Sequence, residues 1–328
     1  AGRGVHDRAE GCLLGSAVGD ALGAQVEFQP RGSFEPVERM TGGGRYNLAP
    51  GMWTDDLSMA LCLGESLLEK GGHDPCDQAR NYLRWYREAH LASNGLCFDI
   101  GMTVSIALRN FERTQEPYSG PTGERAAGNG CLMRLAPVPI FYMDDPERGI
   151  HVAGDQARTT HGPNEAIDCC RYYCALVIGA LQGKAKEELL SPFFVPDGCG
   201  KSVWAGSGEL APKVAELANG AYKGKAEGEV RNSGYVVLAM EAALWGFHRT
   251  SSFRDGMLLL VNLGDDSDTI GAIYGMLAGA FYGLGGIPRD WAGPVTFGGM
   301  VAEMARELRE RGRALGRQRT ETKKTKSE

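Results

Sequence analysis

The sequence predicts an all-α protein with one compact core. Long apolar runs with helical spacing alternate with loops rich in Gly, Pro, Ser and Thr. Strand signals are scarce, because the chain has no alternating Val, Ile and Thr runs joined by hairpin turns and no βαβ rhythm. A Gly-x-Gly-x-x-Gly motif after a strand and the Walker A motif are both absent, so neither supports an α/β nucleotide-binding fold.

Composition narrows the class of protein. The 328 residues allow one large domain or two smaller ones, and the 43% hydrophobic content is ample for a sizeable core. A formal net charge of -6 argues against a general nucleic-acid-binding protein. No apolar run approaches the roughly 18 residues of a membrane span. Charged residues interrupt the first apolar segment, so we expect no signal peptide there.

The nine cysteines are more consistent with free thiols than with a disulfide framework. Cys169, Cys170 and Cys174 follow His161, a combination that can bind zinc, but they lack a Cys-x-x-Cys pair. They also lie within the apolar helical run 166–181, which favours buried, reduced thiols. We therefore expect a cytoplasmic protein.

The first predicted helix carries a stripe of glycines. Four of them recur at every fourth residue: Gly11, Gly15, Gly19 and Gly23. Glycine weakens a helix by about 1 kcal/mol relative to alanine, so close approach of another helix or of a ligand is expected to compensate. Asp20 and Glu27 would share one face if this helix continues. A partnered buried carboxylate and a solvated helix end remain the alternatives for these two residues.

Two later helices begin with clusters of oxygen-bearing side chains. After a loop at residues 30–50, Thr54, Asp55 and Asp56 precede the apolar run 57–68. Near the end of the chain, an acidic cluster precedes the small-residue run 270–282: Asp265, Asp266, Asp268 and Thr269. One or two carboxylates suffice to cap a helix. The surplus oxygens favour hard divalent cations, so the two helix starts are predicted to hold a pair of metal ions between them.

The middle of the chain offers further candidates. Asp99 opens a predicted helix that runs to about residue 111, where capping is the alternative role. The loop Gly128-Asn129-Gly130 leads into the apolar run 131–142 and offers backbone N–H groups to an anion such as a phosphate, unless it is an ordinary turn. His161 is expected at the start of the next helix, as a cap, a surface group or a site residue.

The remaining predicted helices span 74–90, 211–217, 235–248, 252–263 and 298–315. The chain then ends in a basic stretch without an apolar period. We expect residues 316–328 to form a disordered tail after a single domain at 1–315.

Taken together, seven segments in order resemble the ADP-ribosylglycohydrolase family, and most closely its arginine-specific members. They are GSAVGDALGAQVEF, MTGGGR, WTDD, FDIGMT, AGNGCLMR, ARTTHG and NLGDDSDTIGAIYGMLAGAFYG. The resemblance covers nearly the whole chain. It implies a compact orthogonal bundle of many helices around a centre of two divalent metal ions, Mg²⁺ or Mn²⁺.

The resemblance also implies roles for individual residues. Thr54, Asp55 and Asp56 match the first metal-binding motif of the family, and Asp266, Asp268 and Thr269 match the second, with Asp268 bridging the ions. Glu27 matches a glutamate implicated in catalysis, and Asp99 an aspartate that faces the substrate ribose. The expected ligand-binding residues are Gly128, Asn129 and Gly130 at the pyrophosphate, His161 in the ADP-ribose cleft and Tyr235 against the adenosine.

The implied function is metal-dependent removal of mono-ADP-ribose from arginine side chains of modified proteins, with ADP-ribose as product and a monomer as the expected state. Glu27 would act as general base or position the water, and Asp99 would handle protons at the ribose or guanidinium. The alternatives are cleavage of serine-linked or other O-linked ADP-ribose, a catalytically silent ADP-ribose-binding relative, and a phosphohydrolase acting on nucleotide pyrophosphates.

Two positions depart from the family pattern. Asp265 stands where glycine is usual, and it either adds an acidic group beside the metals or caps the helix. Leu57 stands where threonine is frequent.

Overall fold

A computed structural model describes residues 2–325 of the chain. The α-helices are α1 (Gly2–Gly23), α2 (Asp55–Lys70), α3 (Pro75–Glu88), α4 (Met102–Thr114), α5 (Gly130–Met133), α6 (Pro137–Phe141), α7 (Pro146–Arg158), α8 (Asn164–Leu181), α9 (Lys186–Leu189), α10 (Pro212–Ala218), α11 (Val236–Arg249), α12 (Phe253–Val261), α13 (Ser267–Tyr282), α14 (Arg289–Ala292) and α15 (Gly298–Thr325). Seven short 3₁₀ segments complete the described helical structure: η1 (Ala24–Val26), η2 (Glu124–Ala126), η3 (Lys201–Trp204), η4 (Gly206–Gly208), η5 (Ala221–Gly224), η6 (Glu227–Glu229) and η7 (Leu284–Gly286).

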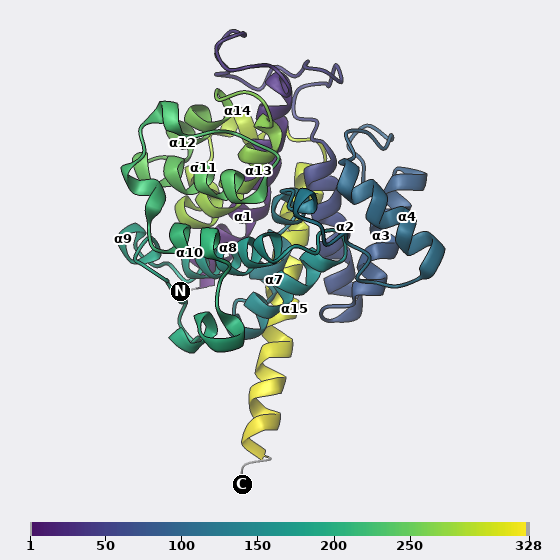
Figure 1. Ribbon diagram of the computed structural model, residues 1–328, viewed down its shortest axis with the longest axis vertical. Coiled ribbons are helices and arrows are strands. Elements are labelled where there is room, and N and C mark those ends of the chain that lie inside the picture. The colour runs from purple at the N-terminus through teal and green to yellow at the C-terminus, as the bar shows by residue number, and fades with distance from the viewer. Residues whose placement is uncertain (1, 326–328) are drawn as a thin grey trace.

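The all-α prediction is confirmed. Over residues 2–325 the backbone forms no β-strand, and the β-type pairing consists of two isolated bridges, Gly43 with Leu48 and Gly128 with Tyr235. One continuous cluster of buried apolar side chains runs through the helices. In Figure 1, α2, α3 and α4 lie on one side of the central helices α1 and α13, and α11 and α12 lie on the other.

The centre of the fold is the antiparallel pair α1 and α13, which pack backbone against backbone. A Cβ added at Gly15 would lie 2.4 Å from the carbonyl oxygen of Gly275, and one at Gly19 would lie 1.9 Å from that of Gly271. Gly11 faces Gly279 and Gly23 faces Ser267 in the same way. The predicted close approach of a second helix to the glycine stripe is therefore confirmed, and the partner is the small-residue helix α13.

This close packing sets where the acidic residues lie. Because α1 and α13 run antiparallel, the C-terminal end of α1 lies beside the N-terminal end of α13. Helix α2 packs against both of them. The two acidic helix starts that the sequence singled out are thereby brought to one end of the central pair.

Three helix boundaries differ from those expected. The run 131–142 is divided into α5 and α6, because Pro137 cannot continue the hydrogen bonding of a helix that began earlier. His161 lies in the turn after α7 instead of at a helix start, since Pro163 delays α8 to Asn164. Asp99 lies two residues before Gly101, the N-cap of α4, so it is not the capping residue.

The last helix also extends further than the sequence suggested. Helix α15 continues past Leu315 to Thr325, and its final turns project beyond the body of the molecule (Figure 1). Residues 316–325 contain no proline and several residues with good helix propensity, which explains why the helix continues where a disordered tail was expected. The last part of that expected tail, residues 326–328, lies outside the described residues.

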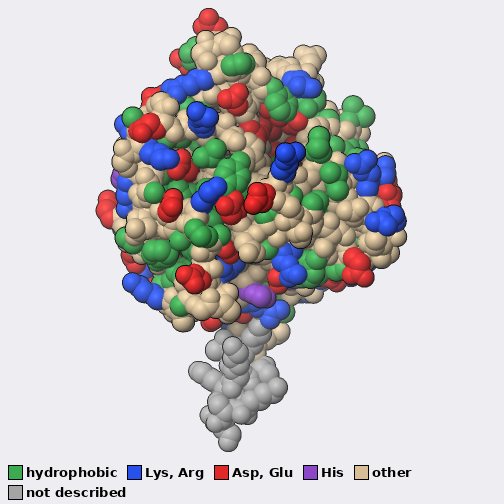
Figure 2. Space-filling view, in the orientation of Figure 1, with side chains coloured by type: hydrophobic (Ala, Val, Ile, Leu, Met, Phe, Trp, Pro, Cys, Tyr) green, Lys and Arg blue, Asp and Glu red, His purple; other side chains and the backbone are tan. Residues whose placement is uncertain are grey.

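The structure bears on two further expectations, one about the cysteines and one about membrane-spanning helices. All nine cysteines are free, and Cys169, Cys170 and Cys174 are buried, as predicted. Among the described helices, none combines the length and the apolarity needed to cross a bilayer. On the face shown in Figure 2, basic and acidic side chains are interspersed, and a group of acidic side chains is recessed in a hollow in the upper half.

Candidate metal centre and active site

Carboxylates from separate parts of the chain converge where α1, α2 and α13 meet. Three groups of acidic residues each bring one oxygen per residue within 4.8 Å of the others. The groups are Asp20 with Asp56 and Asp268, Glu27 with Asp266 and Asp268, and Asp55 with Asp99 and Asp268. Asp268 is common to all three, and it is almost fully buried. The structure therefore brings the two predicted acidic helix starts together around one shared carboxylate.

Asp20 holds the start of α2 in place. Its carboxylate accepts hydrogen bonds from the backbone N–H groups of Thr54, at 3.0 Å, and Leu57, at 3.1 Å. The first N–H groups of a helix have no partner within it, so a carboxylate from α1 here caps α2 from outside. The reading of Asp20 as a partnered buried carboxylate is confirmed. The departure at Leu57 leaves this cap intact, because the backbone of Leu57 makes the bond while its side chain is buried in the core.

The hydroxyl of Thr54 lies among three carboxylates. Its Oγ1 is 2.8 Å from Asp20 Oδ1, 3.0 Å from Asp268 Oδ2 and 3.2 Å from Asp56 Oδ1. A threonine hydroxyl has one proton, so it can donate to one of these oxygens at a time. In the other two contacts, the hydroxyl oxygen of Thr54 lies close to a carboxylate oxygen with no proton between them. A nearby cation would stabilise this arrangement.

Further observations fit a bound cation at this place. Within this cluster, three buried carboxylate oxygens have no hydrogen-bond partner among the described residues: Glu27 Oε2, Asp56 Oδ2 and Asp268 Oδ1. Burial and the neighbouring negative charge of Asp56 raise the pKa of Asp20 well above its usual range. Burial and then Asp266 raise the pKa of Asp56 to about 7. Carboxylates this close repel one another unless protons or cations compensate them, and a donor set made of oxygens suits hard divalent ions.

Glu27 and Asp99 form a second feature beside the cluster. Glu27 follows η1 and is 4% exposed, so the alternative of a solvated helix end is wrong. The two carboxyl groups lie close enough together for each to affect the pKa of the other. Burial, followed by the contact with Asp99, raises the pKa of Glu27 to about 11, and burial raises the pKa of Asp99. In the absence of a cation, burial and the neighbouring carboxyl groups therefore favour the protonated form of Glu27.

Tyr46 also belongs to this site, although the sequence analysis did not identify it. Its hydroxyl donates to Asp99 Oδ1 at 2.7 Å, and its ring packs against Phe98 at a centroid distance of 4.9 Å. Tyr46 follows directly on the MTGGGR segment, a location that could have drawn attention to it. The loop that carries Tyr46 thus fixes the orientation of Asp99.

Asp265 adopts a left-handed backbone with φ of 52°. Its N–H donates to Gln29 O and its carbonyl accepts from Phe28 N, each at 2.8 Å, so it joins two loops at the site. The residue before α13 is Asp266, and Asp265 is exposed at the cavity wall. Asp265 is therefore not the helix cap, and it lines the cavity without belonging to any of the three acidic groups around Asp268. A left-handed conformation is most easily adopted by glycine.

A cavity of about 500 Å³ opens onto these residues. Glu27, Asp55, Asp99, Asp266 and Thr269 line one part of it. The predicted phosphate loop lines another part with Gly128, Asn129 and Gly130, next to His161. The cavity therefore connects the acidic cluster with the loop predicted to bind an anion.

Asn129 links these two parts directly, because its Nδ2 donates to Asp266 Oδ2 at 2.7 Å. Tyr235 is arranged differently from the other predicted ligand-binding residues. Its backbone bridges Gly128, but its side chain is not among the cavity-lining groups, and its hydroxyl donates to Glu165.

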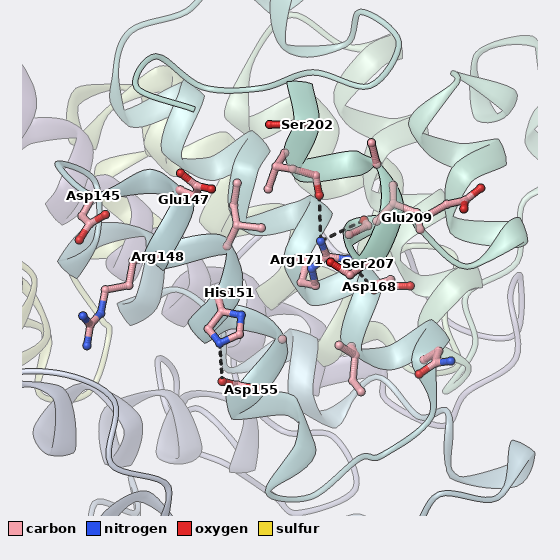
Figure 3. A pocket seen from close by; sticks show the side chains of 18 of the residues that line it. Asp145, Glu147, Arg148, His151, Asp155, Asp168, Arg171, Ser202, Ser207 and Glu209 are labelled. Atoms are coloured by element: carbon pink, nitrogen blue, oxygen red, sulfur yellow. Dashed lines mark hydrogen bonds and ion pairs between the residues drawn. The ribbon is translucent and has the colours of Figure 1, made fainter. Parts of the chain in front are cut away.

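A larger hollow of about 1530 Å³ lies elsewhere, between α7, α8 and residues 202–212 (Figure 3). It contains none of the predicted site residues. Within it, Arg171 is paired with Asp168 at 2.9 Å, and His151 lies 3.1 Å from Asp155. Size alone would favour this hollow, but the converging carboxylates with unpartnered oxygens lie in the smaller cavity, which we therefore take as the candidate active site.

The chain is similar to known proteins over nearly its whole length. The sequence profile of the ADP-ribosylglycohydrolase family matches residues 2–318. The chain is 40% identical over 305 residues to the ADP-ribosylarginine hydrolase Tri1 of Pseudomonas putida (strain GB-1), covering 93% of this chain and 78% of that protein. It is 32% identical over 321 residues to the ADP-ribosyl-dinitrogen reductase glycohydrolase of Rhodospirillum rubrum, covering 96% and 97% of the two chains.

The fold comparison gives the same result. A solved structure described as an ADP-ribosylglycohydrolase-related protein complex superimposes with a TM-score of 0.81 at 41% identity, covering 94% of this chain and 99% of that one. The sequence profile, the curated relatives and the fold all agree on one family. This chain belongs to the ADP-ribosylglycohydrolase family.

Proposed function

We propose that this protein is a hydrolase that removes ADP-ribose from modified arginine side chains of proteins. The observation that carries the proposal is the convergence of three sets of acidic residues on Asp268, two of which include Glu27 or Asp99. They lie at a cavity that is also lined by the loop predicted to bind an anion. The names of the relatives from Pseudomonas putida and Rhodospirillum rubrum support an ADP-ribosylated substrate, and the first of them supports arginine as the modified residue.

The acidic cluster is proposed to hold two divalent ions, Mg²⁺ or Mn²⁺. The residues that would hold them are Thr54, Asp55, Asp56, Asp266, Asp268 and Thr269, and Asp20 keeps Thr54 in place. When bound, such ions supply Lewis-acid assistance to a water molecule and to the ribose hydroxyls. Oxygen ligands alone favour Mg²⁺ or Mn²⁺ over Zn²⁺, which prefers histidine and cysteine.

In the proposed reaction, water adds to the anomeric carbon and the bond from that carbon to the guanidinium nitrogen breaks. The carbon acquires oxocarbenium character as the bond breaks, and the neighbouring carboxylates stabilise that positive charge. Glu27 positions the water and accepts its proton, and Asp99 supplies a proton to the leaving nitrogen, so that the water is divided between the anomeric carbon and the released arginine. Asp99 faces the ribose and guanidinium, held by the hydroxyl of Tyr46.

The other end of the cavity is proposed to bind the ADP part of the substrate. Gly128, Asn129 and Gly130 line the cavity beside His161, and the two glycines let the ring of His161 approach the loop backbone closely. Backbone N–H groups of such a loop can bind an anion. The side chain of Tyr235 would have to leave Glu165 in order to contact an adenosine. All of these groups come from one chain, which supports a monomer as the active unit. The nine free cysteines support a reducing compartment such as the cytoplasm.

The test is release of ADP-ribose from an arginine-ADP-ribosylated protein, with Mg²⁺ or Mn²⁺ and with chelator, alongside a serine-linked substrate. Metal-dependent release of intact ADP-ribose from arginine supports the proposal. Release from serine alone would reject the proposed linkage, and release of AMP would indicate a phosphohydrolase. No release from either substrate, by protein shown to contain metal, would favour a silent ADP-ribose-binding relative.

A further inference from the structure

Arg134 is a fully buried cation with no acidic partner among the described residues. Its guanidinium donates to Gln156 Oε1 at 2.9 Å, to Gln156 O at 2.8 Å, to Thr159 Oγ1 at 3.1 Å and to Thr160 Oγ1 at 2.7 Å. It also lies over the ring of Tyr82, 4.7 Å from its centroid. A buried charge without a counter-ion is costly, and four of the five N–H donors of Arg134 are used on neutral acceptors.

Thr160 connects this arginine to His161. Its hydroxyl accepts from Arg134 Nη1 and lies 2.7 Å from His161 Nδ1. Arginine can only donate, so the single hydroxyl proton of Thr160 is free for another acceptor. The described residues offer that proton one acceptor, His161 Nδ1. Nδ1 is therefore unprotonated, and the neutral ring carries its proton on Nε2.

The ring of His161 lies against the Gly128–Gly130 loop. A Cβ at Gly130 would be 2.9 Å from the ring atom Cε1, and one at Gly128 would be 3.3 Å from Nε2. Burial, with the positive charge of Arg134, lowers the pKa of His161 to about 3, so the ring is neutral at ordinary pH. His161 lines the cavity, and its Nε2 makes no hydrogen bond within the described part of the chain.

We infer that Arg134 and Thr160 are positioning residues that fix His161 as its Nε2–H tautomer, so that this N–H donates to an oxygen of the bound ligand beside the Gly128–Gly130 loop. The ligand class, a diphosphate ester such as ADP-ribose, rests on the proposed function. The tautomer decides whether the contact between Nε2 and the phosphate is attractive or repulsive. A protonated Nε2 donates a hydrogen bond to a phosphate oxygen, whereas an unprotonated Nε2 would turn its lone pair towards that oxygen and repel it.

The chain offers a matched pair of variants. Thr159 and Thr160 are both buried, and both accept a hydrogen bond from Arg134. Thr159 donates to Gln156 O instead of contacting the histidine. Thr160→Val removes the donor to Nδ1, Thr160→Ser retains it, and Thr159→Val removes an acceptor of Arg134 without touching His161. These exchanges avoid Arg134 itself, whose loss from the interior would endanger folding.

The experiment is long-range ¹H–¹⁵N NMR of the histidine side chains in ligand-free protein, followed by calorimetric titration with ADP-ribose. The chain has six histidines, and His161→Gln identifies the signal. We expect His161 to be Nε2-protonated in the wild type, Thr160→Ser and Thr159→Val, and to lose this single state in Thr160→Val. We also expect Thr160→Val to weaken ADP-ribose binding about tenfold or more, as for one lost hydrogen bond to a charged group.

An Nδ1-protonated wild-type ring, or a tautomer unchanged by Thr160→Val, would overturn the inference. Equal loss of affinity in Thr159→Val and Thr160→Val would also overturn it, because the effect would then be general damage around Arg134. The NMR measurement needs no ligand, so it is independent of the proposed function. Wild-type protein that fails to bind ADP-ribose would refute the proposed function and the ligand contact, while the tautomer result would stand on its own.

Discussion

Replacing Gly19 with alanine should separate the two central helices and damage the metal centre at the same time. The added Cβ would lie 1.9 Å from the carbonyl oxygen of Gly271, whereas ordinary contact begins at 3.4 Å. The deficit is 3.4 − 1.9 = 1.5 Å, and it falls on the backbone of α13, which cannot rotate away as a side chain would. Alanine also gains about 1 kcal/mol of helix propensity, which offsets part of the cost.

The magnitude follows from these two effects. Overpacking a core costs about 1–3 kcal/mol and occasionally more, and a backbone clash belongs at the upper end of that range. After the propensity gain, we expect a loss of about 2 kcal/mol or more in the free energy of unfolding. Asp20 follows Gly19 directly and holds the start of α2. Movement of α1 away from α13 would therefore increase the distance between Thr54 Oγ1 and Asp268 Oδ2, which is now 3.0 Å. We expect this separation to weaken metal binding.

Urea unfolding and a titration with Mn²⁺ would measure both effects. Gly4→Ala is the matched control, because it lies in the same helix and a Cβ there meets no atom within 4 Å. We expect the control to retain or slightly raise stability and to bind metal as the wild type does. If Gly19→Ala were as stable as the wild type, the two helices would not be held by backbone contact, and our account of the glycine stripe would be refuted.

Four further predictions concern the site. In metal-free protein, the raised pKa values of Asp56, about 7, and Glu27, about 11, mean that the folded state binds more protons than the unfolded state. Its thermal stability should therefore fall as pH rises from about 4 through 7 and beyond, and added Mn²⁺ should reduce this decline. Glu27→Gln should lower kcat by about 100-fold or more in single-turnover assays. ADP-ribose affinity in that variant should change little. Asp265→Gly should raise the free energy of urea unfolding by up to about 1 kcal/mol, because glycine adopts the left-handed backbone without strain. Tyr46→Phe keeps the ring contact and should lower activity about tenfold with an unchanged circular dichroism spectrum.

The sequence predicted the helical class and the two acidic helix starts because both depend on local patterns. Helical periodicity and clustered oxygen-bearing side chains can be recognised within one segment. The four regularly spaced glycines likewise indicate, within one segment, that another group packs closely against the helix. The identity of that partner was not visible, because the contact of Gly19 with Gly271 depends on how the whole bundle closes.

The roles that the sequence did not reveal act across the fold. Asp20 was expected to be a partnered buried carboxylate, but its partner, the start of a helix to which it does not belong, was not predicted. Tyr46, which was not predicted at all, reaches Asp99 from a separate loop. Arg134 lies within a segment that the sequence analysis quoted, but its role depends on Thr160 and a buried environment that spacing does not reveal. For Asp99, capping was the alternative to a role in the site, because aspartate is a common N-cap. The structure has Gly101 as the N-cap and Asp99 two residues earlier, in a left-handed backbone with φ of 62°.

The packing of α1 against α13 also constrains when the protein can become active during its synthesis. Asp20 leaves the ribosome early, but Thr54 and Asp268, which meet at the site, are 214 residues apart. Until α13 emerges, the glycine face of α1 has no partner and half of the acidic cluster does not exist. Contacts between such distant parts of a chain raise the contact order and slow folding. A nascent chain stalled before residue 267 should therefore bind no metal pair, and activity should arise late, as the final helices join the first.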